Sequence, residues 1–157
     1  MKRRINLVVD TRRARQAQER WPLPFIAESG RVFRFNVAGA PRTKGNHPVA
    51  MWKKKRVVIL PSRAYRIWLA AALDQVPFIR QASGLKGMII APIHVRAIFY
   101  RERKTGDLDN YEKGLGDFLE RARFLSNDKL IASWDGTRLE VDRARPRIEV
   151  EITVLGA

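Results

Sequence analysis

Cysteine is absent from this chain of 157 residues. Without thiols the protein forms no disulfide bonds, binds no metal through thiolates and has no cysteine nucleophile. The sequence also has no apolar run near the roughly 18 residues that a membrane-spanning helix needs. The apolar stretch close to the start, Ile5 to Val9, is too short for a secretory signal. These absences predict a cytoplasmic protein with no membrane partner, and they leave open whether it is bacterial or phage-encoded.

Acidic residues are scarce relative to basic ones. The chain has 31 Lys and Arg against 16 Asp and Glu, a formal net charge of +15. A positive field of that size concentrates polyanions near the protein surface and steers them toward it. Nucleic acid is the commonest such partner, although basic ribosomal and membrane-surface proteins carry a similar excess. The charge therefore favours a nucleic-acid-binding function without identifying the activity.

The first 28 residues differ in composition from the rest of the chain. Up to residue 20 they include seven Lys and Arg against two acidic residues, and Trp21 to Pro24 has the composition of a stiff linker. We interpret residues 1–28 as a basic N-terminal extension. Its charges are either simply solvated or make extra contacts with DNA or a second subunit. Residues 29–157 are expected to form one domain.

The spacing of apolar residues beyond residue 28 predicts an α+β domain with one mixed sheet and two main helices. Strands are expected at 31–37, within 51–61 after a basic turn, at 88–101, 130–134, 137–141 and 148–154. The two helices are expected at 63–76, after Ser62 as N-cap, and at 109–123. Asp135-Gly136 between two strands is typical of a hairpin turn.

Four aromatic or imidazole side chains are interpreted as structural. Trp52 and Trp68 have the π faces on which bases stack, but we expect both to be buried in the core. His94 belongs to a regular strand pattern, and His47 lies in a loop without metal-ligand spacing. Neither histidine is therefore expected to act as a general base or as a metal ligand.

The stretch from residue 100 to 113 contains the residues with the clearest chemistry. Asp107 and Asp109 lie two apart at a helix start, so in extended backbone their carboxylates point to the same side. Two close carboxylates repel unless a cation neutralises them, and divalent cations such as Mg²⁺ prefer oxygen ligands. Lys113 lies one helical turn beyond Asp109, over the same surface. This spacing is compatible with a metal site but does not require one.

A further aspartate, Asp128, lies in a polar turn between the second helix and the next strand. A helix of about 14 residues is about 21 Å long, so Asp128 reaches the first pair only if the chain doubles back. Spacing alone leaves that open. A structural interpretation is also open, in which Asp109 or Asn110 only caps the helix and Lys113 pairs with a carboxylate on a solvated face.

The segments GDLDNYEKGLGDFL and FLSNDKLI resemble the signature of the RusA family of Holliday junction resolvases. Further similarity lies in the loop of Pro41 and Asn46, in Tyr65-Arg66 and in the closing strand, so that it covers about residues 31 to 156. The resemblance implies a RusA-like fold, a homodimer and a Mg²⁺-dependent endodeoxyribonuclease that resolves four-way junctions in DNA recombination and repair. Mn²⁺ is the expected substitute, and no nucleotide cofactor is expected.

Position by position, the resemblance implies three metal-binding aspartates and one catalytic lysine. These residues are Asp107, Asp109, Asp128 and Lys113. Asn127 stands where some members carry a second Asp, so we interpret it as a helper rather than a ligand. Two basic clusters are expected to bind DNA phosphates, unless their charges are only solvated. The clusters are Arg101, Arg103 and Lys104, and Lys53, Lys54, Lys55 and Arg56.

Two other functions remain open from the sequence. One is the same hydrolytic chemistry on flaps, forks or RNA. The other is a non-catalytic DNA-binding module whose carboxylates only cap a helix. A ribosome-associated basic protein is disfavoured because the acidic residues cluster around 107–128.

Overall fold

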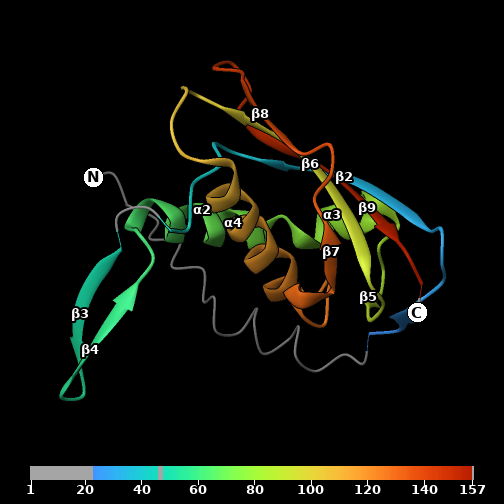
Figure 1. Ribbon diagram of the computed structural model, residues 1–157, viewed down its shortest axis with the longest axis horizontal. Helices are drawn as coiled ribbons and strands as arrows, with labels where there is room; N and C mark the ends of the chain where they lie inside the picture. The colour runs from blue at the N-terminus through green and yellow to red at the C-terminus, as the bar shows by residue number, and fades with distance from the viewer. Residues whose placement is uncertain (1–22, 46–47, 157) are drawn as a thin grey trace, which may run out of the picture.

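The computed structural model describes residues 23–45 and 48–156 (Figure 1). The predicted extension up to residue 22 lies outside the described residues, as do Asn46 and His47. We placed the domain boundary at residue 28, but Phe25–Ile26 already forms strand β1. This strand pairs in parallel with β5 (Met88–Ile89) and buries Ile26. None of the described helices has the length and apolar content to cross a membrane.

A five-stranded mixed sheet forms the centre of the fold and confirms the predicted α+β class (Figure 1). Its strands in spatial order are β2 (Val32–Ala38), β9 (Arg147–Val154), β6 (Ile93–Arg101) and β7 (Ile131–Ser133), with β8 (Arg138–Val141) also beside β6. β9 is antiparallel to both of its neighbours, whereas β7 and β8 are parallel to β6. The two longest strands, β6 and β9, therefore lie side by side in the middle of the sheet.

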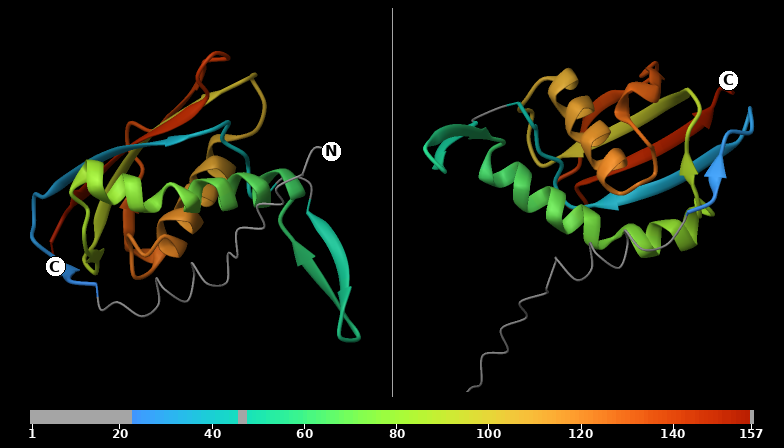
Figure 2. Two further views of the ribbon diagram at one scale, coloured as in Figure 1. Left: turned by 180° about the vertical axis from the view of Figure 1, so that it is seen from behind. Right: turned by 90° about the horizontal axis from the view of Figure 1, so that it is seen from below.

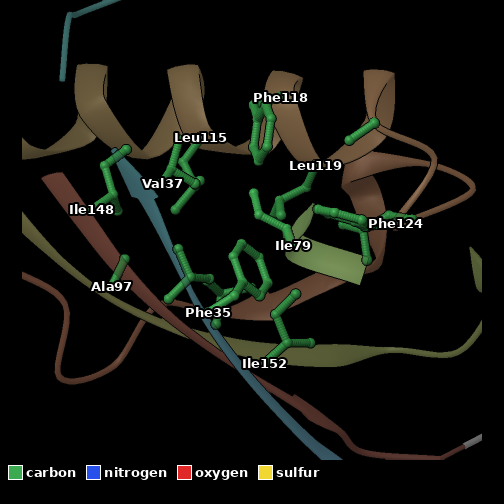
Figure 3. Packing of buried hydrophobic residues seen from close by; sticks show 14 of the residues in the cluster. Phe35, Val37, Ile79, Ala97, Leu115, Phe118, Leu119, Phe124, Ile148 and Ile152 are labelled. Atoms are coloured by element: carbon green, nitrogen blue, oxygen red, sulfur yellow. The ribbon is translucent and has the colours of Figure 1, made fainter. Parts of the chain in front are cut away.

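Alternation along the strands gives this sheet one buried face and one face toward solvent. Every second side chain of β9 is buried, and β2 buries Phe33, Phe35 and Val37. The buried side chains of β6 are Ile93, Val95, Ala97, Phe99 and Arg101. Figure 3 shows the buried face of the sheet packed against α4, with Phe35 and Ile148 below Leu115 and Phe118.

Three α-helices pack on the buried face, within the part of the chain that the structure describes (Figure 2). They are α2 (Arg63–Asp74), α3 (Val76–Ser83) and α4 (Leu108–Arg121). As predicted, Ser62 caps α2, and its hydroxyl accepts a hydrogen bond from the Tyr65 amide at 3.2 Å. The predicted helix 63–76 ends two residues early, at Asp74, because a second helix, α3, starts at Val76 with Pro77 in its first turn. Proline is favourable in a first turn, where the helix does not need its missing N–H.

The expected hairpin at Asp135-Gly136 is wrong. β7 and β8 on either side of this turn do not pair with each other, and both run parallel to β6. The turn is local, with the Thr137 amide donating to the Trp134 carbonyl, and Thr137 Oγ1 accepts a hydrogen bond from the Ala97 amide. The chain therefore leaves the edge of the sheet after β7 and returns to β6 as β8, running in the same direction.

The residues from 49 to 60 form a hairpin rather than a basic turn before one strand. Among the strands of the described residues, β3 (Val49–Lys53) pairs only with β4 (Arg56–Leu60), and the two project from the body of the protein (Figure 1). Trp68 is buried in the core as predicted, but the same prediction for Trp52 is wrong. The Trp52 side chain is 79% exposed, because a hairpin that leaves the sheet has no core beneath it.

Candidate active site

The site is built where β6 runs through a charged loop into α4. Asp107 occupies the N-cap position of α4 in extended backbone, yet among the described residues its side chain makes no capping hydrogen bond. Gly106 before it has φ 79°, and a Cβ there would lie 2.8 Å from Thr43 Cγ2 and 3.0 Å from the Tyr111 ring. Glycine therefore fits the turn, and the exposed Asp107 carboxylate is left available for another role.

Arg101 holds this loop in place. Its guanidinium donates to the Thr105 carbonyl at 2.8 Å, and the Tyr111 hydroxyl donates to the same oxygen at 2.9 Å. Arg101 is only 9% exposed and also donates to the Glu140 carbonyl. We expected Arg101 to contact DNA, but its position gives it a structural role. Burial follows from its place on the inner face of β6, two residues after Phe99.

The chain doubles back after α4 and returns to the helix. The short helix η1 (Asp128–Leu130) lies beside Gly116, where a Cβ would be 3.8 Å from Asp128 Cβ. The Asn127 side chain caps η1 by accepting from the Lys129 amide at 2.9 Å, and the Asp128 amide donates to Glu120 at 3.0 Å. The chain therefore doubles back and returns Asp128 to the surface of α4 beside Gly116.

Asp109, Lys113 and Asp128 line one open pocket of about 280 Å³. Its remaining lining residues are Glu112, Gly116, Ile131 and Trp134. Asp107 is not among the lining residues. Three of the four expected site residues thus come together, and the fourth lies just beyond, at the N-cap of the same helix.

The pocket contains both signs of charge. Lys113 Nζ lies 3.2 Å from Asp109 Oδ2, with both side chains more than half exposed. An exposed pair of this kind is weak, so little free energy holds the lysine in that position. Burial, and next the charge of Asp109, raise the pKa of Glu112 above its ordinary value. Negative charge is therefore crowded at this end of α4.

Glu112 was missed by our sequence analysis. It lies three residues after Asp109 and four before Gly116, and such positions share a helix face. Helical spacing from Asp109 through Glu112, Lys113 and Gly116 was thus a usable signal for the whole wall of the pocket.

The donors of the pocket fit a divalent cation in chemistry and charge. Asp109, Glu112 and Asp128 offer carboxylate oxygens, the ligands that Mg²⁺ and Mn²⁺ take from proteins. Burial is the larger cause of the raised pKa of Glu112, and a cation there would relieve the second cause, which is the repulsion from Asp109. Within residues 23–45 and 48–156, however, no three His, Cys, Asp or Glu lie close enough to form a metal cluster. The described arrangement supplies the donors without gathering them around one point.

Asp117 faces a different part of the molecule. Its carboxylate lies 3.0 Å from the Tyr65 hydroxyl, 3.4 Å from Lys44 Nζ and 3.3 Å from Arg121 Nε. Burial and then Asp117 raise the pKa of Tyr65, so the hydroxyl stays protonated and donates. Asp117 therefore ties α2 and the loop before residue 46 to α4, and the pocket does not include it.

The other basic residues expected to bind DNA are exposed. Arg103 and Lys104 lie in the loop just before Asp107, and Arg42 in the neighbouring loop is 3.8 Å from Glu102. Lys53, Lys54, Lys55 and Arg56 are exposed at the end of the β3–β4 hairpin. His94 lies on β6 as predicted, away from the lining of the pocket.

Comparison with known proteins bears on this geometry. A family model described as endodeoxyribonuclease RusA matches residues 38–153, most of the chain. No curated protein matches the sequence. The matched range runs from the end of β2 into β9 and includes every residue of the pocket, as well as the β3–β4 hairpin.

Proposed function

This chain belongs to the RusA family of endodeoxyribonucleases, and from that premise we propose that it cuts four-way junctions by metal-dependent hydrolysis in DNA recombination and repair. One observation carries the proposal. Asp109 and Asp128 come from separate segments of a chain with net charge +15, yet they line one pocket together with Lys113. Such a pocket would hold a cation and an anionic phosphate side by side.

Asp109 and Asp128 are the residues that would hold Mg²⁺ or Mn²⁺, with Asp107 adjacent and Glu112 as a further oxygen donor. Bound there, a divalent ion supplies a nucleophilic water at neutral pH and neutralises charge on the scissile phosphate. Together these carboxylates would hold one or two such ions.

The protein's own residues orient the reactants. Asp109 or Asp128 accepts a hydrogen bond from the attacking water and aims it at phosphorus. Lys113, whose ion pair with Asp109 is exposed, turns to the phosphate and stabilises negative charge on its oxygens or on the leaving oxygen. Removing one such electrostatic contact typically lowers a rate by about 10² to 10³.

DNA binding uses a separate set of residues. Arg103 and Lys104 are placed to contact phosphates of the strand that is cut, and the basic end of the β3–β4 hairpin reaches another arm of the junction. Such contacts position the protein without reading sequence. We further propose a homodimer, because two active sites match the two-fold symmetry of a four-way junction and allow paired cuts.

The test compares incision of a four-way junction with incision of duplex, flap and single-stranded DNA, each with Mg²⁺, Mn²⁺ or EDTA. We expect cuts in the junction only, and only with a divalent ion. Preferred cutting of flaps would keep the chemistry and change the substrate. Failure to cut any of these DNAs would overturn the hydrolytic proposal in favour of a DNA-binding module.

The role of Asp107 needs its own variant, since this residue lies outside the pocket lining. Asp107→Asn is expected to abolish incision while junction binding survives, with Asp74→Asn on the exposed end of α2 as the matched control. Normal incision by Asp107→Asn would remove Asp107 from the site.

A further inference from the structure

The β3–β4 hairpin is an arm with no structural partner in the described chain. Its strands pair only with each other, and Figures 1 and 2 show it extending from one end of the molecule. A two-stranded hairpin alone in water is marginally stable. Its side chains are therefore expected to gain a partner when the protein acts.

One face of the arm is apolar and exposed. Trp52 is paired with Val57 across the hairpin, and Ile59 lies two residues further along the same face. The three side chains are 79%, 54% and 72% exposed, respectively. Single exposed apolar residues are common on protein surfaces, but three on one face with an aromatic nearest the tip form a patch that can bind.

The two residues at the tip of the arm are lysines in a backbone conformation that lysine disfavours. Lys54 and Lys55 have φ of 46° and 64°, and they connect Lys53 to its partner Arg56. A two-residue turn with two positive φ angles favours asparagine and glycine, because lysine is disfavoured in left-handed backbone. Folding alone gives no reason for lysine at both positions, whereas a ligand of negative charge does.

The positive charge of the tip distinguishes between two partners that could cover the apolar face, a second copy of this chain and a nucleic acid. No acidic residue lies between 48 and 60, so the four consecutive cations at the tip are not offset within the arm. A second copy of this chain, with net charge +15, is a poor complement to that tip. Single-stranded or unstacked nucleic acid combines phosphates for the cations with base faces for the aromatic ring.

We propose that the hairpin is a nucleic-acid-binding arm in which Trp52 stacks on a base exposed at the branch point while Lys53–Arg56 contact the flanking phosphates. This inference rests on the proposed function for the identity of the DNA. It adds a specificity element, because a duplex with all its bases stacked offers no face to Trp52 without the cost of unstacking. The arm would thus favour branched over linear DNA.

Binding measured in EDTA tests the arm without any incision. The DNAs are a four-way junction and a duplex of matched length, each with 2-aminopurine, placed in the junction either at the branch or within an arm. We expect wild-type protein to change 2-aminopurine fluorescence at the branch and not within the arm. Trp52→Ala should lose that signal and bind the junction about tenfold more weakly, within the range that one base stack provides. Its duplex affinity should change less than twofold.

Two matched variants separate stacking from folding of the arm. Trp52→Phe keeps a ring and should restore most of the junction affinity, whereas Ile59→Ala removes a similarly exposed side chain from the same face and should change it little. Lys54→Asn combined with Lys55→Gly keeps the turn and removes two charges. It should reduce the slope of log affinity against log salt by about 2.

Three results would overturn the arm's assignment: junction affinity of Trp52→Ala equal to wild type, fluorescence changes that do not depend on probe position, or loss of self-association by Trp52→Ala in sedimentation. The last would assign the face to a second copy of the chain. These results are independent of catalysis. If the wild type cuts junctions but Trp52→Ala binds them normally, the proposed function is retained and the arm is rejected. If binding depends on Trp52 but no DNA is cut, the arm is retained and the proposed function is rejected.

Discussion

The pocket on α4 and the β3–β4 hairpin differ in charge and in their relation to the core. The pocket is lined by carboxylates on a helix whose other side carries Leu115, Phe118 and Leu119, all fully buried. The hairpin is basic and apolar, and no strand outside it pairs with either of its strands in the described chain. In the proposed function, the hydrolytic site therefore lies on an element of the core, whereas the proposed DNA contacts extend away from it.

Removing a carboxylate from the pocket should lower incision and leave DNA binding, which we assign to other residues, unchanged. Asp128→Asn is expected to lower junction incision about a thousandfold or more, because a metal-supported hydrolysis loses several kcal/mol of transition-state stabilisation. Junction affinity in EDTA should be unchanged, since the Lys and Arg side chains that we propose to bind DNA lie outside the pocket. Single-turnover incision and a binding titration provide the two measurements.

Asp135→Asn is the matched control for Asp128→Asn, because Asp135 is also exposed and lies seven residues further along, outside the pocket. It should cut at the wild-type rate. If Asp128→Asn and Asp135→Asn behave alike, the pocket is not the centre of hydrolysis and the contrast between the two regions loses its functional meaning.

Lys113 tests whether a cation in the pocket differs from a cation elsewhere on the same helix. Lys113→Ala should lower the incision rate by about 10² to 10³ while leaving junction affinity within about twofold. Arg121→Ala removes a cation that pairs with Asp117 and should have less than a tenth of that effect. Equal losses for both variants would show that general charge on α4, rather than the position of Lys113, supports cutting.

The two regions also differ in how far the sequence predicts them. α4, β6 and β9 follow from the periodicity of buried residues, because each buries one side of a regular element. The same alternation that placed Phe99 inside also places Arg101 inside, so its structural role was within reach of the sequence. The return of Asp128 to α4 was not, since a turn composition does not specify the direction that the chain takes.

The hairpin shows the limit of pattern reasoning. Val57 to Leu60 is as apolar as a buried strand, yet none of its residues belongs to the core. Burial depends on whether another element covers a strand, and strand pairing is a long-range property. For the same reason β7 and β8 were expected to pair with each other, although both add to β6.

Two glycines on α4 sharpen the contrast between the core side and the pocket side of one helix. A Cβ on Gly114 would lie 3.0 Å from Tyr65 Cε2, and that ring is fixed by hydrogen bonds from its hydroxyl to the Gly114 carbonyl and Asp117. Gly114→Ala should therefore lower the free energy of unfolding by about 1 to 3 kcal/mol, as overpacking does. Thermal or urea unfolding measures the change.

Gly116→Ala is the control for Gly114→Ala. Its Cβ would lie 3.6 Å from Ile131 and 3.8 Å from Asp128, which is ordinary contact. Alanine should then raise the free energy of unfolding, by up to about 1 kcal/mol, through its better helix propensity. Destabilisation by both substitutions would mean that the pocket side of α4 is packed as tightly as its core side.

The smallest expected effect separates two turns, one held by charge and one not. Asp142, between β8 and β9, accepts hydrogen bonds from the Arg145 and Ala144 amides and from Arg147 at 2.9 Å. The Arg145 amide and then the Arg147 side chain are the main groups that lower the pKa of Asp142. A carboxyl with a lowered folded pKa stabilises the fold above its unfolded pKa, and that contribution is lost as pH falls through the folded pKa.

Asp142→Asn keeps an oxygen acceptor and removes the charge. Its melting temperature should therefore lie slightly below that of wild type at pH 7 and converge with it in acid. The Lys54→Asn and Lys55→Gly double variant, altered in a turn that contains no acid, should show no such convergence. A constant difference for Asp142→Asn at every pH would assign the β8–β9 turn to hydrogen bonding alone.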